Sequence, residues 1–339
     1  MSAEERKCLH GKYWLIIALL GIALAMSLAL NARRVGRDFA GFQWKRSAAP
    51  GGLAEDEHPQ FEERRSWGDG NRKVVRIAVE GLITSGGETG WFGVSTDPTG
   101  DIIRQIRAAT NDEDVAALIV EVDSPGGEVA PTDEIYNALR AFRESRDDRR
   151  VVAFVRGMAA SGGYYVAAAA DRIIAEPTAI VGSISVIIQS LNWHALSERV
   201  GVTSTVIASG RHKDMLNPFK PENPEHIALL RRVVDATHAR FSQVVAEGRG
   251  LSDEEVAAVA DGTIFSVPDA VEKRLVDDTG YWEDAVEGVA EMLEDTVRVV
   301  RYSKTLRFSD WLARLRGPAA DLSAAVPPRG PRLLMLWQP

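Results

Sequence analysis

The sequence has 339 residues and a single cysteine, Cys8. A lone cysteine excludes an intrachain disulfide and a cysteine-based metal cluster, and it leaves the redox compartment open. The chain also lacks a concentrated basic face, and its formal net charge is -8. Because phosphate backbones are bound by clustered Lys and Arg, no nucleic-acid partner is expected.

Histidine pairs at metal-binding spacing are also missing. His226 and His238 are twelve residues apart on a predicted long helix, where exposure or helix packing explains them, and His194 lies in a polar turn. None has a partner at the spacing of a zinc-binding helix. The sequence therefore predicts no metal and no cofactor.

Charged residues are absent from Tyr13 to Leu30, 18 positions that would form about 27 Å of helix, close to the thickness of a bilayer core. The apolar region of a secretory signal is shorter, and the cleavage-like Ala23-Leu24-Ala25 lies inside the run. We expect an uncleaved single-pass anchor over about 13–30, within an N-terminal segment 1–34.

Basic residues flank this span on both sides. Arg6, Lys7 and Lys12 precede it, and Arg33, Arg34, Arg37, Lys45 and Arg46 follow it. Since basic residues prefer the cytoplasmic side, this count favours a cytoplasmic main domain. Residues 35–71 are rich in Gly, Pro and acidic residues and are predicted to be a flexible linker.

Strand, glycine turn and helix then repeat within a predicted domain of residues 72–295. Buried strands are expected at Val74–Val79, Val115–Val122, Val151–Val155 and Arg172–Ala175. Repetition of this unit predicts an α/β fold whose turns gather at one edge.

The later part of the domain is predicted to be mainly helical. We expect a strand at Val202–Ile207, a polar turn at Ser209–Asp214, and helices at Pro224–Gly248, from Ser252, and at Glu283–Leu293. Glu255 follows Ser252 at the spacing of a capping box. The C-terminal tail, 296–339, is expected to be irregular from Pro327 onward.

Ser161 stands where a predicted strand turns into a helix, followed by Gly162 and Gly163. Glycines let a substrate approach closely, and a helix start offers free N–H groups to a negative charge. Asp123–Gly127 forms a second turn whose glycines, with the Gly162 N–H, are candidates for an oxyanion hole. The alternatives are a serine that caps a helix and a simple β-turn.

Four motifs together resemble the signal peptide peptidase A family of membrane-bound serine proteases. They are Ser124–Gly127, Met158–Tyr165, Gly182–Ile184, and Ser209-Gly210 with Lys213-Asp214, in that order. The resemblance extends over roughly Lys73 to Leu293. It implies a ClpP/crotonase-like spiral of repeated strand-turn-helix units.

The same resemblance assigns roles to individual residues. It implies that Ser161 is the nucleophile, that Lys213, 52 residues downstream, is the general base, and that Ser183 orients the lysine amine. Gly126, Gly127 and Gly162 remain the oxyanion-hole candidates that the two turns themselves indicate. A lysine downstream in one chain is similar to the short form of the family rather than to the tandem form.

A lysine base needs a pKa lowered from about 10.4 toward about 7 to 8, which burial near Ile184, Val186 and Ile187 would achieve. Asp214 would oppose this if it faced the amine, and we expect it to point elsewhere. Ser185 departs from the family pattern, which has glycine there. A solvated surface Lys213 is the ordinary alternative, and His212 is the rival base.

The expected protein is therefore a membrane-anchored serine endopeptidase that cleaves extended peptides such as remnant signal peptides. The resemblance implies a homo-oligomer, an octameric ring, in the cytoplasmic membrane, with the catalytic domain extracytoplasmic, against the count of basic residues. A crotonase-type acyl-CoA enzyme and an inactive membrane scaffold are the alternatives. The apolar run Leu333–Trp337 is a candidate pseudo-substrate for a neighbouring subunit, or a membrane or subunit contact.

Overall fold

The computed structural model describes residues 56–86, 88–89, 95–303 and 333–336. The predicted membrane anchor at 13–30 and the first part of the predicted linker lie outside these ranges. Across the described ranges, no helix combines the length and the apolar character that crossing a membrane requires.

A sheet that has nine strands among the described residues forms the centre of the fold. Its main path runs β1 (Glu62–Trp67), β13 (Val297–Ser303), β2 (Arg72–Glu80), β5 (Val115–Ser124), β7 (Arg150–Ala160), β8 (Arg172–Ala175) and β12 (Asp278–Thr279). Off this path, β9 (Ile180–Gly182) pairs with β7 and β11 (Ile264–Ser266) pairs with β9. Only β1 and β11 pair antiparallel within this sheet.

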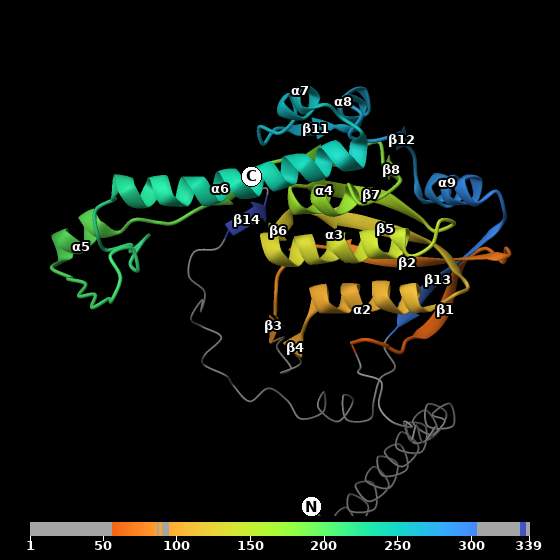
Figure 1. Ribbon diagram of the computed structural model, residues 1–339, viewed down its shortest axis with the longest axis horizontal. Helices are drawn as coiled ribbons and strands as arrows, with labels where there is room; N and C mark the ends of the chain where they lie inside the picture. Colours follow the sequence, from red (N-terminus) through yellow and green to blue (C-terminus); the bar gives the residue numbers. More distant parts are fainter. Residues whose placement is uncertain (1–55, 87, 90–94, 304–332, 337–339) are drawn as a thin grey trace, which may run out of the picture. The chain divides into compact units, whose positions relative to one another are not determined.

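The central strands are largely buried, because helices cover both faces of the sheet, and the buried Glu121 of β5 pairs with Arg76 of β2. Helices α2 (Pro98–Asn111), α3 (Val129–Glu144) and α4 (Gly162–Ala167) lie in a row on one face, and α9 (Trp282–Leu293) packs against β5, β7 and β13 (Figure 1). Successive β5 side chains alternate between two cores: Leu118 and Val120 enter the first, Ala117 and Ile119 the second. The predicted α/β fold is confirmed.

The sheet extends beyond the predicted domain limits of 72 and 295. Strand β1 lies within the predicted linker, and β13 lies within the predicted tail. The two pair with each other, and β13 pairs in parallel with β2. Both strands are thus part of the folded domain, because they continue the hydrogen-bonded ladder of the central strands.

Helix α6 (Pro224–Arg249) is the longest described helix, and its predicted range is confirmed within a residue. Its C-terminal half packs on α4, where Phe241 contacts Tyr165 at 5.0 Å between ring centroids. Helix α5 (His194–Val200) and the segment that follows it lie toward the opposite, N-terminal end of α6 (Figure 1).

The remaining helices follow the sequence closely. Helix α7 (Asp253–Ala257) begins with the predicted capping box between Ser252 and Glu255, and α8 (Val267–Glu272) follows β11. The predicted strand at Val202–Ile207 is wrong: this stretch is irregular and exposed, and among the described residues it pairs with no strand.

Two small sheets complete the fold. One joins β3 (Glu88–Thr89) to β4 (Ser95–Thr96). The other has the order β10 (Ile187–Ile188), β14 (Leu333–Leu336), β6 (Gly126–Glu128). The prediction of an irregular C-terminus is wrong for Leu333–Leu336, because partners on both sides pair with this segment as a strand.

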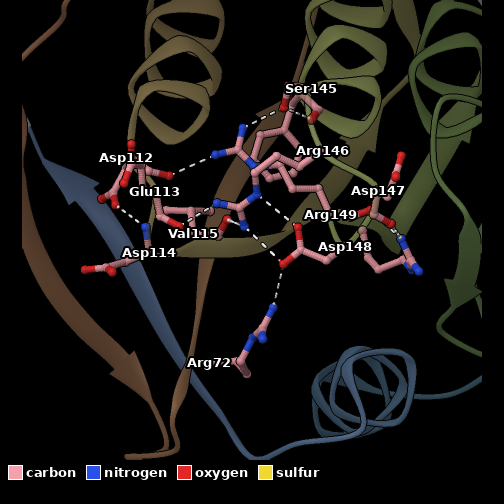
Figure 2. A network of polar contacts seen from close by, with 12 residues as sticks. Arg72, Asp112, Glu113, Asp114, Val115, Ser145, Arg146, Asp147, Asp148 and Arg149 are labelled. Carbon is pink, nitrogen blue, oxygen red and sulfur yellow. Dashed lines mark hydrogen bonds and ion pairs between the residues drawn. The ribbon is translucent and has the colours of Figure 1, made fainter.

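A polar network fixes the end of the sheet where β5 and β7 begin (Figure 2). The Arg146 guanidinium donates to the carbonyl of Glu113 at 2.6 Å and pairs with Asp148 at 2.9 Å. Arg149, 2% exposed, donates to the Asp112 carbonyl at 2.9 Å. These bonds join the α2–β5 turn to the α3–β7 turn. They anchor the strands whose other ends carry the candidate site.

Candidate active site

Ser161 occupies the one residue between β7 and α4, at φ 52° and ψ -117°. A positive φ is rare for any residue with a Cβ, and such positions cost about 1–3 kcal/mol. Two backbone bonds hold the corner: the Ser161 N–H donates to Gly182 O at 2.7 Å, and the Tyr165 N–H donates to Ser161 O at 2.9 Å. Ser161 is therefore held in a strained conformation at the turn from strand to helix.

Strand β9 brings Ser183 to the same edge. Gly182 pairs with Ala160 in parallel register, so the residues that follow, Ser183 and Ser161, leave neighbouring strands together. Ser183 also has a positive φ of 51°, held by donation of its N–H to Thr263 O at 2.7 Å. The Ser161 hydroxyl lies 3.5 Å from the carbonyl oxygen of Ser185.

Gly126 and Gly162 lie against each other beside this corner. A Cβ added to Gly126 would lie 2.5 Å from the Gly162 nitrogen and 2.1 Å from the carbonyl oxygen of Met335. A Cβ added to Gly162 would lie 3.1 Å from that same oxygen. The two glycines therefore leave room for a peptide carbonyl, which Met335 of β14 supplies.

Gly127 directs its N–H toward the same strand. Gly126 O accepts from the Ile83 N–H at 3.0 Å, and the Glu128 N–H donates to Ile83 O at 2.8 Å. Since backbone groups alternate along a strand, the N–H and C=O of Gly127 point the other way, toward β14, where Gly127 pairs with Met335. The N–H of Gly126 is already used by the Ser124 hydroxyl at 3.0 Å. Gly126 thus leaves room for a peptide carbonyl but offers no free N–H donor to the candidate oxyanion hole.

Lys213 does not join this group within the single chain. It lies exposed in the turn between α5 and α6, where its N–H donates to Gly210 O at 3.1 Å. That turn is tied to the start of α6, through an Arg211–Glu225 ion pair of 2.8 Å. The structure thus brings together Ser161, Ser183, Gly126, Gly127 and Gly162, whereas the Ser161/Lys213 dyad stays a prediction.

The neighbours of Lys213 have other partners. Asp214 accepts from the Lys220 ammonium at 2.6 Å, and this hydrogen bond lowers the pKa of the Asp214 carboxyl. The carboxylate therefore points toward Lys220, as expected. His212 packs edge-on against His226, with ring centroids 5.3 Å apart, in the same turn as Lys213.

Two further histidines contact backbone carbonyls, His194 that of Phe219 at 3.3 Å and His238 that of Ala260 at 2.8 Å. Within the ranges that the structure describes, no three His, Cys, Asp or Glu side chains gather as metal ligands would.

The structural roles of Ser124 and Tyr165 were not predicted, although both residues belong to the motifs named above. Ser124 fixes the turn before the glycines: its hydroxyl donates to Gly81 O at 2.6 Å and accepts from the Gly126 N–H. Its position directly after a buried strand and before Pro-Gly was the available signal. Tyr165 hydrogen-bonds Asp133 at the floor beside β14, and burial raises the pKa of its hydroxyl. Nothing in the sequence places Tyr165 and Asp133 together.

A serine at a strained strand-to-helix corner, beside glycines that receive the carbonyl of an extended segment, defines a serine hydrolase acting on peptides. Residues 143–296 match the model of peptidase family S49, and residues 92–190 match that of Clp protease.

Among curated proteins, the chain is 34% identical to "Putative signal peptide peptidase SppA" of Enterococcus faecium, over 74% of this chain and 73% of that protein. It is 33% identical to "Protease 4" of Salmonella typhi, over 65% of this chain and 34% of that protein. "Serine protease SPPA, chloroplastic" of Arabidopsis thaliana is 29% identical over 55% of this chain and 27% of its own length. The chain belongs to peptidase family S49, as a serine protease of the SppA and protease IV kind.

Proposed function

We propose that this chain is a membrane-anchored endopeptidase that cleaves extended peptides, remnant signal peptides among them, with Ser161 as nucleophile and Lys213 as general base. The observation that carries the proposal is the extended segment β14, which pairs with β6 and brings a peptide carbonyl to Gly126 and Gly162. Family membership favours a peptidase over the acyl-CoA enzyme and the inactive scaffold.

The same proposal includes the type of fold, the membrane anchor and the location of the catalytic domain. The repeated strand-turn-helix units suggest the ClpP/crotonase-like spiral. A charge-free Tyr13–Leu30 would anchor the chain in the cytoplasmic membrane, with the catalytic domain extracytoplasmic. A tethered enzyme meets substrates left in the bilayer at high effective concentration.

Lys213 needs a second copy of the chain to reach a serine. The Lys213 turn is bonded to Glu225, whereas Tyr165 of α4, the helix that follows Ser161, packs on Phe241, 16 residues later (241 − 225). At 1.5 Å per residue, this separation corresponds to about 24 Å along the helix. A rigid α6 thus keeps a chain's own lysine away from its own serine. We propose that Lys213 serves the Ser161 of a neighbouring subunit in a homo-oligomer, the octameric ring.

The surface around Lys213 is suited to this contact. Large apolar side chains are exposed along 191–233, at Leu191, Trp193, Leu196, Val200, Val202, Val206, Ile207, Phe219, Ile227 and Val233. Ile207 is 97% exposed. Contiguous exposed apolar surface marks protein interfaces, so these side chains are suited to a subunit contact. Covering them with another copy would also take the Lys213 amine out of water, which favours its neutral form.

In the assembled site, the Ser161 hydroxyl attacks the substrate carbonyl carbon and gives its proton to the neutral Lys213 amine. The N–H groups of Gly127 and Gly162 stabilise the negative charge on the carbonyl oxygen. The lysine then passes the proton to the leaving amine as the peptide bond breaks. Water, deprotonated by the same amine, hydrolyses the acyl-serine. Ser183 is proposed to orient the amine.

A subunit-mixing experiment tests the shared site. Ser161→Ala and Lys213→Ala chains, each expected to lose at least about 10³-fold in peptidase activity, are co-expressed in equal amounts with different tags. Random assembly leaves about one quarter of shared sites with both residues intact, so about one quarter of wild-type activity should return. Activity no higher than that of either parent would refute the shared dyad.

Two controls accompany the mixture. The double variant mixed equally with wild type should also give about one quarter of the activity if the dyad is shared, and about one half if each chain completes its own site. Labelling by a fluorophosphonate must require both Ser161 and Lys213. Labelling that survives Lys213→Ala but disappears with His212→Ala would replace the proposed base.

A further inference from the structure

Three arginines lie opposite one another on neighbouring strands of the central sheet. Arg64 of β1 is the register partner of Arg301 of β13, and Arg301 is in turn the partner of Arg76 of β2. Because neighbouring strands lie about 4.8 Å apart, the three Cα atoms form a row of roughly 10 Å. Like charges placed opposite each other on adjacent strands repel, so a bound anion would stabilise this row.

A cavity of about 500 Å³ adjoins the row. Its lining includes four arginines, Arg64, Arg65, Arg76 and Arg301, and none of the described residues that line it is acidic. Arg64, Arg65 and Arg301 are exposed, so an incoming ligand can reach them. A guanidinium group forms paired hydrogen bonds with the oxygens of a phosphate. The lining is therefore suited to a phosphate-bearing ligand.

The carboxylates near this cluster have other partners. Glu121, 1% exposed, pairs with Arg76 at 2.6 Å, and Glu63 forms an ion pair with a lysine of β2. Among the residues that the structure describes, Arg64 and Arg301 have no carboxylate within ion-pair distance. Two of the three charges in the row are thus left for a ligand, whereas Glu121 holds the third in place.

This cluster is a local exception to the expectation that the chain lacks a concentrated basic face. Arg64 and Arg301 are 237 residues apart in the sequence (301 − 64), and strand pairing brings them together. The cluster is also small. Proteins that bind nucleic acids neutralise about 6–10 phosphates along a backbone, so a few arginines on a chain of net charge -8 suit single phosphate groups instead.

An exposed tryptophan on the same strand favours a lipid headgroup as the source of the phosphate. Trp67, 42% exposed, follows Arg64 by three residues. Tryptophan is enriched where a bilayer meets water, and basic clusters beside a membrane bind anionic headgroups. The predicted anchor ends at Leu30, and the 31 residues 31–61 can span about 100 Å when extended. The cluster can therefore reach the bilayer in which the chain would be anchored.

We propose that Arg64 and Arg301, with the cavity beside them, bind the phosphate of anionic phospholipid headgroups and hold the catalytic domain against the membrane. The inference rests on the proposed membrane anchor but not on the peptidase chemistry. An arginine near an anionic surface contributes about fivefold to binding. Replacing both arginines by glutamine should therefore lower the ratio of docked to undocked domains about 25-fold.

The docking test uses the full chain in lipid nanodiscs, with Cys8→Ser and a fluorophore attached through Gln60→Cys, an exposed position just before β1. The discs contain phosphatidylcholine with or without phosphatidylglycerol, and a lipid that carries a nitroxide quencher on its headgroup. Quenching should be strong only with phosphatidylglycerol, and it should fall in the Arg64→Gln/Arg301→Gln variant and in about 1 M salt. Equal quenching in both lipid compositions, or in wild type and variant, would overturn the proposal.

The matched control is Arg231→Gln/Arg232→Gln, which removes the same charge from two exposed arginines of α6 and should leave the quenching unchanged. An equal loss of quenching in this control would show that only net charge matters and would overturn the site. Calorimetric titration with glycerol 3-phosphate, in a neutral detergent, separates a free anion from a headgroup. Binding that requires Arg64 and Arg301, without lipid-dependent quenching, would assign the cluster to a soluble phosphate and refute membrane docking.

Separate readouts distinguish this proposal from the proposed function. The Arg64→Gln/Arg301→Gln variant should cleave a soluble peptide with the kcat/KM of wild type, because neither arginine belongs to the candidate active site. A chain that does not co-purify with nanodiscs would refute the anchor. Such a chain should still float with vesicles that contain phosphatidylglycerol and not with vesicles of phosphatidylcholine alone. Flotation with neither would refute headgroup binding.

Discussion

Replacing Ser161 by glycine is expected to stabilise the chain while abolishing its activity. Ser161 holds φ 52° and ψ -117°, a region that glycine enters freely and that costs other residues about 1–3 kcal/mol. Glycine loses about 0.5–1 kcal/mol through its greater freedom in the unfolded chain. The hydroxyl contact with Ser185 O is long, at 3.5 Å, so little is lost with it. The net gain is about 1 kcal/mol.

Ser161→Ala is the matched control, because it removes the hydroxyl but keeps the Cβ and the strain. By differential scanning calorimetry, the glycine variant should melt about 2–4 °C above the alanine variant. Both variants should lack peptidase activity. A glycine variant that melts at or below the alanine variant would show that the surrounding backbone, rather than strain at Ser161, sets the energy of this corner.

Two further substitutions test the glycine turn of the candidate site and an ion pair that stabilises the fold. Gly126→Ala should lower kcat/KM at least about 10²-fold, because its methyl would lie 2.1 Å from the peptide oxygen of Met335. Gly81→Ala, at φ 70° with open space around it, controls for backbone strain and should retain kcat/KM. Asp112→Asn should lower the free energy of unfolding at pH 7 by about 1–2 kcal/mol in urea titrations, because it breaks a 2.7 Å ion pair with Lys73. Burial alone would raise the pKa of Asp112, but hydrogen bonds led by that from Lys73 outweigh burial and lower it. The stabilisation is therefore present above about pH 4 and is lost as the pH falls through the folded pKa, so wild type and variant should converge in strong acid. A difference that persists unchanged at pH 2 would contradict the assignment.

The local features of the fold were predictable because they depend on neighbours in the sequence. The apolar run of β5 requires a parallel sheet covered on both faces, and the capping box at Ser252 fixed the start of α7. The turn glycines were predictable for the same reason, since Gly126 and Gly162 each come two residues after the end of a strand. The edge strand β1 was missed because its charged, largely exposed residues carry no apolar period.

Long-range contacts account for what the sequence did not reveal. Strand β14 forms only because β6 and β10 flank it, and its own residues resemble an irregular apolar tail. The sequence distance from Ser161 to Lys213 did not indicate that the Lys213 turn would pair with the start of α6 while Phe241, farther along that helix, packs on α4, since a motif fixes order along the chain but not the direction of a later helix. The hydrogen bond from the Gly126 N–H to the Ser124 hydroxyl likewise could not be predicted, because it depends on the conformation of the turn.

Because α6 is long, a small tilt near its C-terminal end would move its N-terminal end by several ångströms. The helix is packed tightly at its C-terminal end, where a Cβ on Gly248 would lie 2.2 Å from Ala168 O. If the helix tilted by about 10° at Phe241, its start, about 24 Å away, would move by about 4 Å, more than the length of a hydrogen bond. Small side chains at Gly248 and Ala168 therefore govern the position of the start of α6, to which the Arg211–Glu225 ion pair ties the preceding turn.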